Sequence, residues 1–350
     1  MKRVLVCVLD WGLGHATRSV PVIRELQRQG ADVVLASSGA AGKLLRQEFP
    51  QLNYHELPGY GPTYQRNGSI IGAMAAQLFK FARTIRMEHL EVETLVRNLR
   101  VDRVISDNRY GCYSTRVPSV LITHQYHIQL APRWSGLAFF VNRWLEFRYR
   151  KFRDVWNPDQ RGSGLTEPFV PPRAKVDYVG WLSRFGHESP DTNGYPIVAV
   201  VSGPEPQRKI FADQLRQELI ASGRRALLVT GQPGEEQRHQ EGNLKICSHL
   251  PAKEMERALR GAGLIIARSG YSTLMDLIAL GRNAVLVPTP QQPEQEFLAR
   301  RLQEMQVAFC PDQQNFVLET AMKEAGAFRG LSHFTKEDGL LEAAIRKLLS

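Results

Sequence analysis

The sequence predicts an α/β protein with two Rossmann-like domains, each built on a parallel sheet. Two features of the chain predict it. Short apolar, β-branched runs alternate with helical segments along the whole sequence, which is the pattern of βαβ units. The chain also has 350 residues, more than one hydrophobic core usually serves. Because the runs are apolar almost throughout, we expect strands that are covered on both faces.

The first domain is expected over residues 1–158. Its apolar runs predict strands at 3–9, 31–36, 103–106 and 119–123, and a helix at 18–29 that ends at Gly30. The periodicity then fails over residues 156–175, which contain four prolines and two glycines. Proline and glycine clusters interrupt regular structure, so we place a linker at 159–175.

A second alternating series predicts another domain at 176–330. Its strands are expected at 196–201, 225–229, 244–248, 264–267 and 284–287, and an amphipathic helix is expected at 336–349. Residues 331–350 either stay with this domain or cross back to the first. Two such domains imply a cleft between them, and sheets of this kind bind ligands at the carboxyl ends of their strands.

Composition and residue spacing exclude several classes of protein. With 43% hydrophobic and 23% charged residues, the chain is neither disordered nor collagen-like nor a coiled coil. No run approaches eighteen consecutive apolar residues, so we expect no membrane-spanning helix, and the apolar N-terminal run is a strand and not a signal peptide. Four cysteines lie far apart without a CxxC pair, which excludes a zinc ribbon and favours a reduced, cytoplasmic chain.

The net charge is concentrated in the first half. Residues 1–158 contain 22 Lys+Arg and 12 Asp+Glu, a net charge of +10, whereas residues 159–350 contain 23 of each. We therefore expect the first domain to meet an anionic partner, such as nucleic acid, acidic lipid or a phosphorylated substrate. No helix-turn-helix, RRM or zinc module accompanies the arginines, which disfavours nucleic acid.

A glycine turn from Asp10 to His15 joins the first predicted strand to a helix. Gly12 and Gly14 allow a ligand to approach the backbone closely, and a helix N-terminus favours anions. A dinucleotide fingerprint would need a third glycine where Thr17 stands, and no acid follows the second strand. An NAD enzyme is therefore disfavoured. The alternative interpretation is a tight turn in which His15 only begins a helix.

A second strand, glycine turn and helix run from Leu264 to Asp276. Amides at this helix start can bind a diphosphate, and the Asp276 carboxylate, about one turn in, can accept both hydroxyls of a ribose. The alternative is a capping box between Thr273 and Asp276, in which the carboxylate only satisfies backbone donors. The polar segment 291–296 follows another predicted strand, and it either binds sugar hydroxyls or forms a solvated loop.

Together these segments resemble the MurG-like family of GT-B glycosyltransferases, which move N-acetylglucosamine from UDP to a lipid-linked acceptor. The glycine turn ending in His15, the ArgSerGly…ThrLeuMetAsp segment and the ValPro…GluGlnGluPhe segment occur in the order and spacing of that family. The resemblance is strongest over residues 263–301, while the segments SGPEPQR and SDNRYG indicate a separate branch. It implies two Rossmann-like domains whose parallel sheets face each other across a cleft.

The resemblance also implies a donor site in the second domain. Asp276 matches the acid that binds the uridine ribose, and Gln295 and Glu296 match two amides that read sugar hydroxyls. Glu296 departs from the second amide, which leaves the sugar open. Ser202 and Gly203 replace a glycine-rich phosphate loop, and two prolines there remove amide donors. The other implied donor residues are Arg184 beside the nucleotide, His249 and Leu250 at the uracil, and Arg268, Ser269, Gly270, Ser272 and Thr273 at the diphosphate.

The first domain is expected to bind the acceptor. His15, His124 and Gln125 face the acceptor in the family that the chain resembles. The full set expected here is Gly12, Gly14, Asp107, Asn108, His124 and Gln125. Two alternatives remain open: His124 and His127 are ordinary polar residues at a strand end, and Asp107 lies in a solvated turn.

Two stretches of the first half, 70–90 and 137–156, mix aromatic and basic side chains. The second contains Phe139, Phe140, Trp144 and Phe147 among several arginines. Basic amphipathic helices of this kind lie at anionic bilayer surfaces. The alternative is that the aromatic rings pack in the core while the arginines are solvated.

The expected activity is an inverting transfer from a UDP-sugar, of N-acetylhexosamine type, to an acceptor hydroxyl. His15 is the first choice of base and Asp10 the second, because an imidazole has a suitable pKa. Amides at 270–272 and Arg184 would stabilise the leaving UDP, and the lack of any Asp-x-Asp fits an enzyme without metal or other cofactor. The acceptor is expected to be an anionic or lipid-linked envelope precursor, met by a cytoplasmic protein at the inner face of the membrane. The alternatives are a UDP-sugar 2-epimerase and a non-catalytic nucleotide-sugar-binding or nucleic-acid-binding protein.

Overall fold

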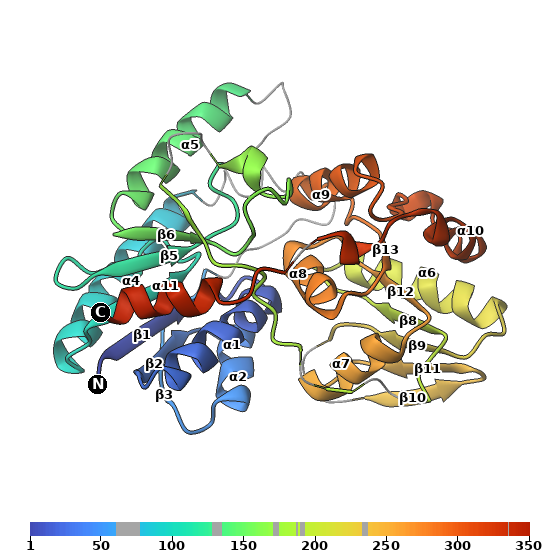
Figure 1. Cartoon of the computed structure of the whole chain (residues 1–350), viewed down its shortest axis with the longest axis horizontal. Helices are drawn as coiled ribbons and strands as arrows, with labels where there is room; N and C mark the ends of the chain where they lie inside the picture. The colour runs from blue at the N-terminus through green and yellow to red at the C-terminus, as the bar shows by residue number, and fades with distance from the viewer. Residues whose placement is uncertain are drawn as a thin grey trace. The chain divides into compact units, whose positions relative to one another are not determined.

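The chain divides into two compact units (Figure 1). The computed structural model describes residues 1–60, 78–127, 135–170, 175–186, 188–189, 193–232, 237–334 and 336–350. Of these, residues up to 182 and residues 336–350 belong to unit 1, and residues 183–334 belong to unit 2. The division therefore falls at Leu182, after the proline-rich stretch and not within it.

Unit 1 is built on a parallel seven-stranded sheet with the order β3-β2-β1-β4-β5-β6-β7. The strands are β1 (Arg3–Val8), β2 (Asp32–Ser37), β3 (Asn53–Glu56), β4 (Arg103–Asp107), β5 (Ser119–Ile122), β6 (Asp154–Asn157) and β7 (Asp177–Tyr178). The chain builds β1, β2 and β3 toward one edge and then continues with β4 on the other side of β1. The order of the sheet thus reverses between β1 and β4, and the carboxyl ends at such a point form a ligand-binding crevice.

The helices of unit 1 are α1 (Leu13–Arg28), α2 (Gly39–Glu48), α4 (Leu78–Asn98), α5 (Ser135–Tyr149) and α11 (Leu340–Leu349), with a 3-10 turn at Glu167–Phe169. One face of α4 packs Val92 and Val96 against Leu5 and Val34 of the sheet. The C-terminal helix α11 belongs to this unit, and its Leu348 carbonyl accepts from Nε of Arg103 at 2.7 Å.

Residues 158–170 fold onto unit 1 although they are rich in proline and glycine. Asp159 is fully buried, and its carboxylate accepts from the amides of Gln160 at 2.7 Å and Thr166 at 3.1 Å. The carbonyl of Asp159 accepts from the amide of Gly180 at 3.0 Å. Residues 158–170 are therefore part of unit 1.

Unit 2 is built on a six-stranded sheet with the order β10-β11-β9-β8-β12-β13. The strands are β8 (Ile197–Val200), β9 (Ala226–Val229), β10 (Arg238–Glu241), β11 (Leu244–Cys247), β12 (Leu264–Ala267) and β13 (Ala284–Leu286). The helices are α6 (Gln207–Ala221), α7 (Ala252–Gly261), α8 (Tyr271–Leu280), α9 (Pro293–Glu304) and α10 (Leu318–Glu324), with 3-10 turns at Gln313–Asn315, Ala325–Ala327 and Leu331–His333. Here the order reverses between β8 and β12, and sheets of this kind bind ligands at the carboxyl ends of strands at such a point.

The predicted strands are confirmed to within about two residues at their ends, and the structure adds others. β3 and β10 are short and polar, because each lies at an edge of its sheet with side chains exposed. β10 runs antiparallel to β11, so the second sheet is mixed and the expectation of a wholly parallel sheet is corrected. The helix expected at 18–29 begins at Leu13, since Gly12 adopts a φ of 82° and precedes the first turn. No helix in the described part of the chain is long and apolar enough to cross a membrane.

Candidate active site

His15 and Asp107 lie at the two strands where the order of the first sheet reverses. His15 is in the first turn of α1, and Asp107 is the last residue of β4. Nδ1 of His15 is 2.9 Å from Oδ1 of Asp107, whose side chain is fully buried, whereas 16% of the His15 side chain is exposed. Because a carboxylate can only accept, His15 donates from Nδ1 and its Nε2 keeps a lone pair.

Arg18 stabilises the charge of this pair. The arginine is buried, its Nε donates to Oδ2 of Asp107 at 2.8 Å, and its Nη1 donates to Nδ1 of His124 at 2.9 Å. Burial alone would raise the pKa of Asp107, but the charge of Arg18 holds that pKa well below its usual range. Burial, followed by Arg18, lowers the pKa of His15 below its usual value of about 6.5. The imidazole is therefore neutral at pH 7, as a general base must be.

Asp10, the second candidate base, is paired with a buried arginine. Its Oδ1 lies 3.4 Å from Nη2 of Arg109, and its Oδ2 accepts from the amide of Tyr60 at 3.3 Å. The Arg109 guanidinium also donates to the carbonyls of Val8 and Pro58, to the Ser38 hydroxyl and to the Glu88 carboxylate. Asp10 thus lies beside Arg109, which links the loops around it, whereas the Nε2 atom of His15 lies on the side of the ring away from Asp107.

The other residues expected at the acceptor surround this pair, and Asp107 is buried among them. Gly12 precedes α1 and Gly14 lies in its first turn. Asn108 has a left-handed backbone with a φ of 56°, and its Oδ1 accepts from the Tyr110 hydroxyl at 3.3 Å. His124 is buried on Arg18, and the Gln125 carbonyl accepts from the Tyr149 hydroxyl at 3.0 Å. His127 is set apart, since its Nε2 lies 3.0 Å from Glu146 on α5.

In unit 2, the start of α8 is held by the buried side chain of Gln295. The helix begins after Gly270, and the Ser269 hydroxyl donates to the Gln295 carbonyl at 2.9 Å. Oε1 of Gln295 accepts from the amide of Thr289 at 2.9 Å. Gly270 faces Nε2 of Gln295, which would lie 3.7 Å from a Cβ at that position. The amide nitrogen of Gln295 therefore points at the glycine turn where a phosphate or sugar would approach.

The capping-box interpretation of Asp276 is wrong. The helix starts at Tyr271, so Thr273 is its third residue and not its cap, and no side chain caps this helix end. The Asp276 carboxylate instead accepts from the Ser183 hydroxyl at 2.6 Å. Burial raises the pKa of Asp276 to about 6, against the opposing charge of Arg184. Its carboxylate is half-buried beside an arginine, as a ribose-binding acid would be.

Arg268 is fully buried, and it supports the loops around α8. Its partners in the described chain are neutral oxygens: the carbonyls of Val287, Pro288 and Gln207, and Oε1 of Gln313. Its guanidinium also lies 4.1 Å from the centroid of the Phe211 ring. Burial lowers the pKa of Arg268 below its usual value. The Arg268 side chain therefore joins, by hydrogen bonds in the interior of unit 2, segments that follow the strands of its sheet.

The other residues expected at the donor differ in their exposure. Ser202 and Gly203 follow β8 and are exposed, and Gly203 has a φ of 111°. Ser272 lies in the first turn of α8. His249 is half-buried after β11, whereas Leu250 is buried. Glu296, which stands where the family that the chain resembles has an amide residue, is exposed. Its Oε1 accepts from the amide of Gln291 at 2.8 Å and so caps the turn before α9.

Comparison with known proteins agrees with this geometry. Residues 209–325 match the glycosyltransferase family 28 C-terminal domain. The matched residues lie within unit 2. Over 309 residues, 83% of this chain and 75% of the relative, the chain is 23% identical to a UDP-N-acetylglucosamine–N-acetylmuramyl-(pentapeptide) pyrophosphoryl-undecaprenol N-acetylglucosamine transferase of Brucella canis.

Two solved structures share the fold. The glycotransferase of kitacinnamycin has a TM-score of 0.67 at 15% identity, covering 99% of this chain and 93% of that one. MurG of Acinetobacter baumannii has a TM-score of 0.57 at 16% identity, covering 100% and 99%. These matches confirm the GT-B fold and the resemblance to MurG-like glycosyltransferases. They also support glycosyltransferase activity.

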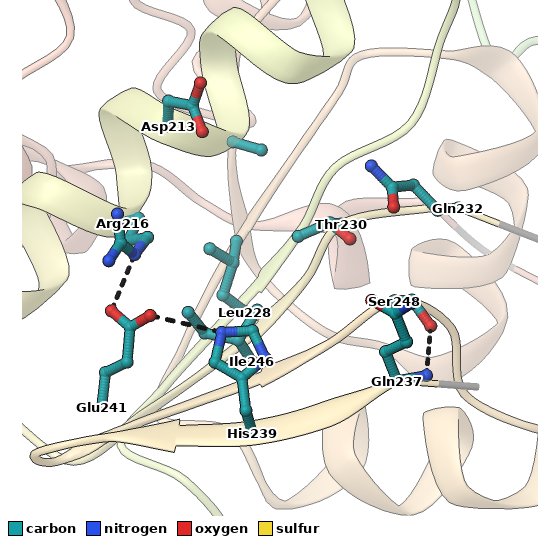
Figure 2. A pocket seen from close by; sticks show the side chains of 11 residues that line it. Asp213, Arg216, Leu228, Thr230, Gln232, Gln237, His239, Glu241, Ile246 and Ser248 are labelled. Atoms are coloured by element: carbon teal, nitrogen blue, oxygen red, sulfur yellow. Dashed lines mark hydrogen bonds and ion pairs between the residues drawn. The ribbon is translucent and has the colours of Figure 1, made fainter. Parts of the chain in front are cut away.

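Unit 2 also contains a cavity of about 270 Å³ between α6 and the β10–β11 hairpin (Figure 2). Arg216 and His239 point at Glu241 inside it, with distances of 2.7 and 3.3 Å. None of the expected donor residues lines this cavity. Its charged groups are already paired, so it adds nothing to the candidate site.

Helix α5 of unit 1 exposes an aromatic face. Phe139, Phe140, Trp144 and Phe147 are between 43% and 71% exposed, whereas Leu145 and Tyr149 pack in the core. The exposed Arg143 lies on the same face, and Nζ of Lys151 is 5.1 Å from the centroid of the Phe147 ring. The interpretation that the aromatic side chains of this helix all pack in the core is therefore wrong. The first basic stretch lies partly outside the described residues, which omit 61–77.

Sequence reasoning missed Arg18 and Ser183. Arg18 occupies a helical position that reads as polar and solvated, yet it is buried on Asp107. Ser183 is separated from Asp276 by 93 residues, so only the fold brings them together. The signal that could have identified Arg18 is a charged residue about one turn after His15. No signal in the sequence could have identified Ser183.

Proposed function

We propose that this chain is an inverting glycosyltransferase that moves a sugar from a UDP-sugar to a hydroxyl of an anionic or lipid-linked acceptor. The hydrogen bond between His15 and Asp107 carries the proposal, since it leaves a neutral imidazole nitrogen at the carboxyl end of the first sheet. The Brucella relative is named for transfer from UDP-N-acetylglucosamine to an undecaprenol-linked acceptor, which favours an N-acetylhexosamine and a lipid carrier.

His15 is proposed as the base. Its Nε2 takes the proton of the acceptor hydroxyl while the oxygen attacks the anomeric carbon and the bond from that carbon to UDP breaks. Asp107 then faces an imidazolium, and its negative charge stabilises it, as a carboxylate partner does in hydrolytic triads. The inverted product carries the new glycosidic bond, and UDP leaves with the electron pair of the broken bond.

Unit 2 is proposed to hold the donor. Asp276 would accept the ribose hydroxyls, the residues after β11 would meet the uracil, and Gln295 would contact the sugar. The amides at the start of α8, together with Arg184, would stabilise the charge that develops on UDP. On this proposal the transfer needs neither a metal ion nor another cofactor.

The aromatic face of α5 is proposed to rest on an anionic membrane surface. Exposed aromatic rings next to Arg143 and Lys151 suit the interface between lipid headgroups and acyl chains, and the excess positive charge of the first half favours acidic lipid. Such contact would keep a cytoplasmic enzyme near a lipid-linked acceptor at the inner face of the membrane.

A nucleotide panel tests the proposal. Thermal unfolding is measured with UDP-, GDP- and dTDP-sugars, and a ligand at a hundred times its dissociation constant should add about 2.7 kcal/mol. Stabilisation by non-uridine nucleotides alone would reject the donor. Release of UDP that depends on added acceptor separates a transferase from a UDP-sugar 2-epimerase, which needs no second substrate.

A further inference from the structure

The hydroxyl group of Ser183 makes two hydrogen bonds, one as acceptor and one as donor. Its oxygen accepts from the amide of Phe185 at 3.1 Å, and it donates to Oδ1 of Asp276 at 2.6 Å. A serine hydroxyl has a single hydrogen, so this hydrogen is committed to Asp276. One carboxylate oxygen is therefore anchored from the loop before β8, and rotation of the carboxylate is restricted.

Two charged residues, Arg184 and Glu256, affect the pKa of Asp276. Arg184 lies next to Ser183 and lowers the pKa of Asp276, and Glu256 on α7 raises it. Glu256 is itself bound, since Oε1 accepts from the amide of Gly186 at 2.8 Å and from Nε of Arg260 at 3.0 Å. The Ser183 hydroxyl is thus the one neutral group among these that donates directly to the carboxylate.

We propose that Ser183 is a positioning residue, which holds the Asp276 carboxylate in the orientation that receives the two ribose hydroxyls of the donor. This inference rests on the proposed nucleotide site in unit 2. With Oδ1 anchored by Ser183, both oxygens keep the lone pairs that a ribose diol needs. The hydroxyl also favours the ionised form, because it donates to the charged oxygen. Ser183 consequently controls the preference for ribose over deoxyribose.

The test measures affinity for UDP and 2′-deoxy-UDP by calorimetry between pH 5 and pH 8.5. Wild-type affinity for UDP should rise with pH through about 6, the pKa of Asp276, and then level off. In Ser183→Ala this midpoint should move upward by about one pH unit, because a hydrogen bond to the charged form is lost. At pH 6 the variant should bind UDP several-fold more weakly and lose most of its preference over 2′-deoxy-UDP. Near pH 8.5, where the Asp276 carboxylate is ionised in both proteins, the variant should still bind UDP several-fold more weakly and lack most of the preference over 2′-deoxy-UDP, because the carboxylate is no longer held in its orientation.

Ser183→Thr keeps the hydroxyl and should behave as the wild type, and the thermal unfolding of both variants shows that they fold. A Ser183→Ala variant that regains the wild-type preference for UDP over 2′-deoxy-UDP near pH 8.5, or that never loses it, overturns the positioning role while leaving the donor site standing. A wild type that does not bind UDP overturns the donor assignment, and this inference with it.

Discussion

Nδ1 of His15 and Oδ1 of Asp107 lie 2.9 Å apart, although 92 residues separate them in sequence. The pair forms because β1 and β4 are neighbours, with Val8 in register with Asp107. The imidazole at the start of α1, just after β1, and the carboxylate at the end of β4 are thus brought together by two adjacent strands.

Replacing His15 with alanine should lower turnover by roughly 100-fold or more, the order of a lost general base. Binding of UDP should change little, because His15 belongs to unit 1 and the proposed donor residues to unit 2. Steady-state rates and calorimetry measure the two effects separately. Asp10→Asn is the matched control, and a larger loss in that variant than in His15→Ala would transfer the role of base to Asp10.

Turnover should fall on the acid side of pH 6.5. The pKa of His15 is lowered, so the neutral base is present at pH 6.5 and above, and protonation removes it only at lower pH. Asp107 opposes this lowering, so Asp107→Asn should move the acid limb to still lower pH while reducing turnover by about 10²–10⁴-fold. Rates measured from pH 5 to 8 test this, and an unchanged rate in Asp107→Asn would remove the carboxylate from the mechanism.

Asp276→Ala should weaken UDP binding by at least about tenfold. The carboxylate would give charge-assisted hydrogen bonds worth roughly 1.5–3 kcal/mol each, and each 1.4 kcal/mol is a factor of ten. The variant should also lose most of the preference for UDP over 2′-deoxy-UDP. Glu319→Ala removes an exposed carboxylate of α10 in the same unit and is the control, which should keep both properties. If the two variants bind alike, the ribose assignment is rejected.

Replacing Phe139, Phe140 and Trp144 with serine should reduce binding to vesicles rich in anionic lipid. The residues are exposed, so folding stability should change little. The same change at Ile210 and Ile220, exposed apolar residues of α6, is the control and should leave vesicle binding intact. Wild-type binding should weaken as salt rises. Equal cosedimentation with neutral and anionic vesicles, or none with either, would reject the membrane proposal.

The buried strands could be predicted because their sequences are apolar on both faces, as in Leu5–Val8 and Ile265–Ala267. The edge strand β10 could not, since Arg238–Glu241 has the composition of a loop and depends on pairing with β11. The start of helix α1 is predicted too late in the chain because His15, Thr17 and Arg18 are polar and obscure the helical pattern at its beginning.

The same limit applies to the site. His15, Asp107 and Asp276 could be selected because each follows an apolar run, where strand ends collect ligands. Their partners depend on contacts that only folding creates, such as the buried Arg18 and the hydroxyl of Ser183. Local spacing even suggested the wrong partner for Asp276, because Thr273 precedes it at the interval of a capping box.

The return of α11 to unit 1 has a consequence for the order in which the protein can mature during synthesis. Unit 1 draws residues from both sides of unit 2, and α11 receives hydrogen bonds from Gln29 and Arg103, residues made at the beginning of translation. A ribosome must therefore polymerise the whole of unit 2 before the surface beside α1 is covered. Domains usually fold in the order in which they emerge from the ribosome. In this chain, unit 2 can complete its folding before α11, the last helix of unit 1, has been synthesised.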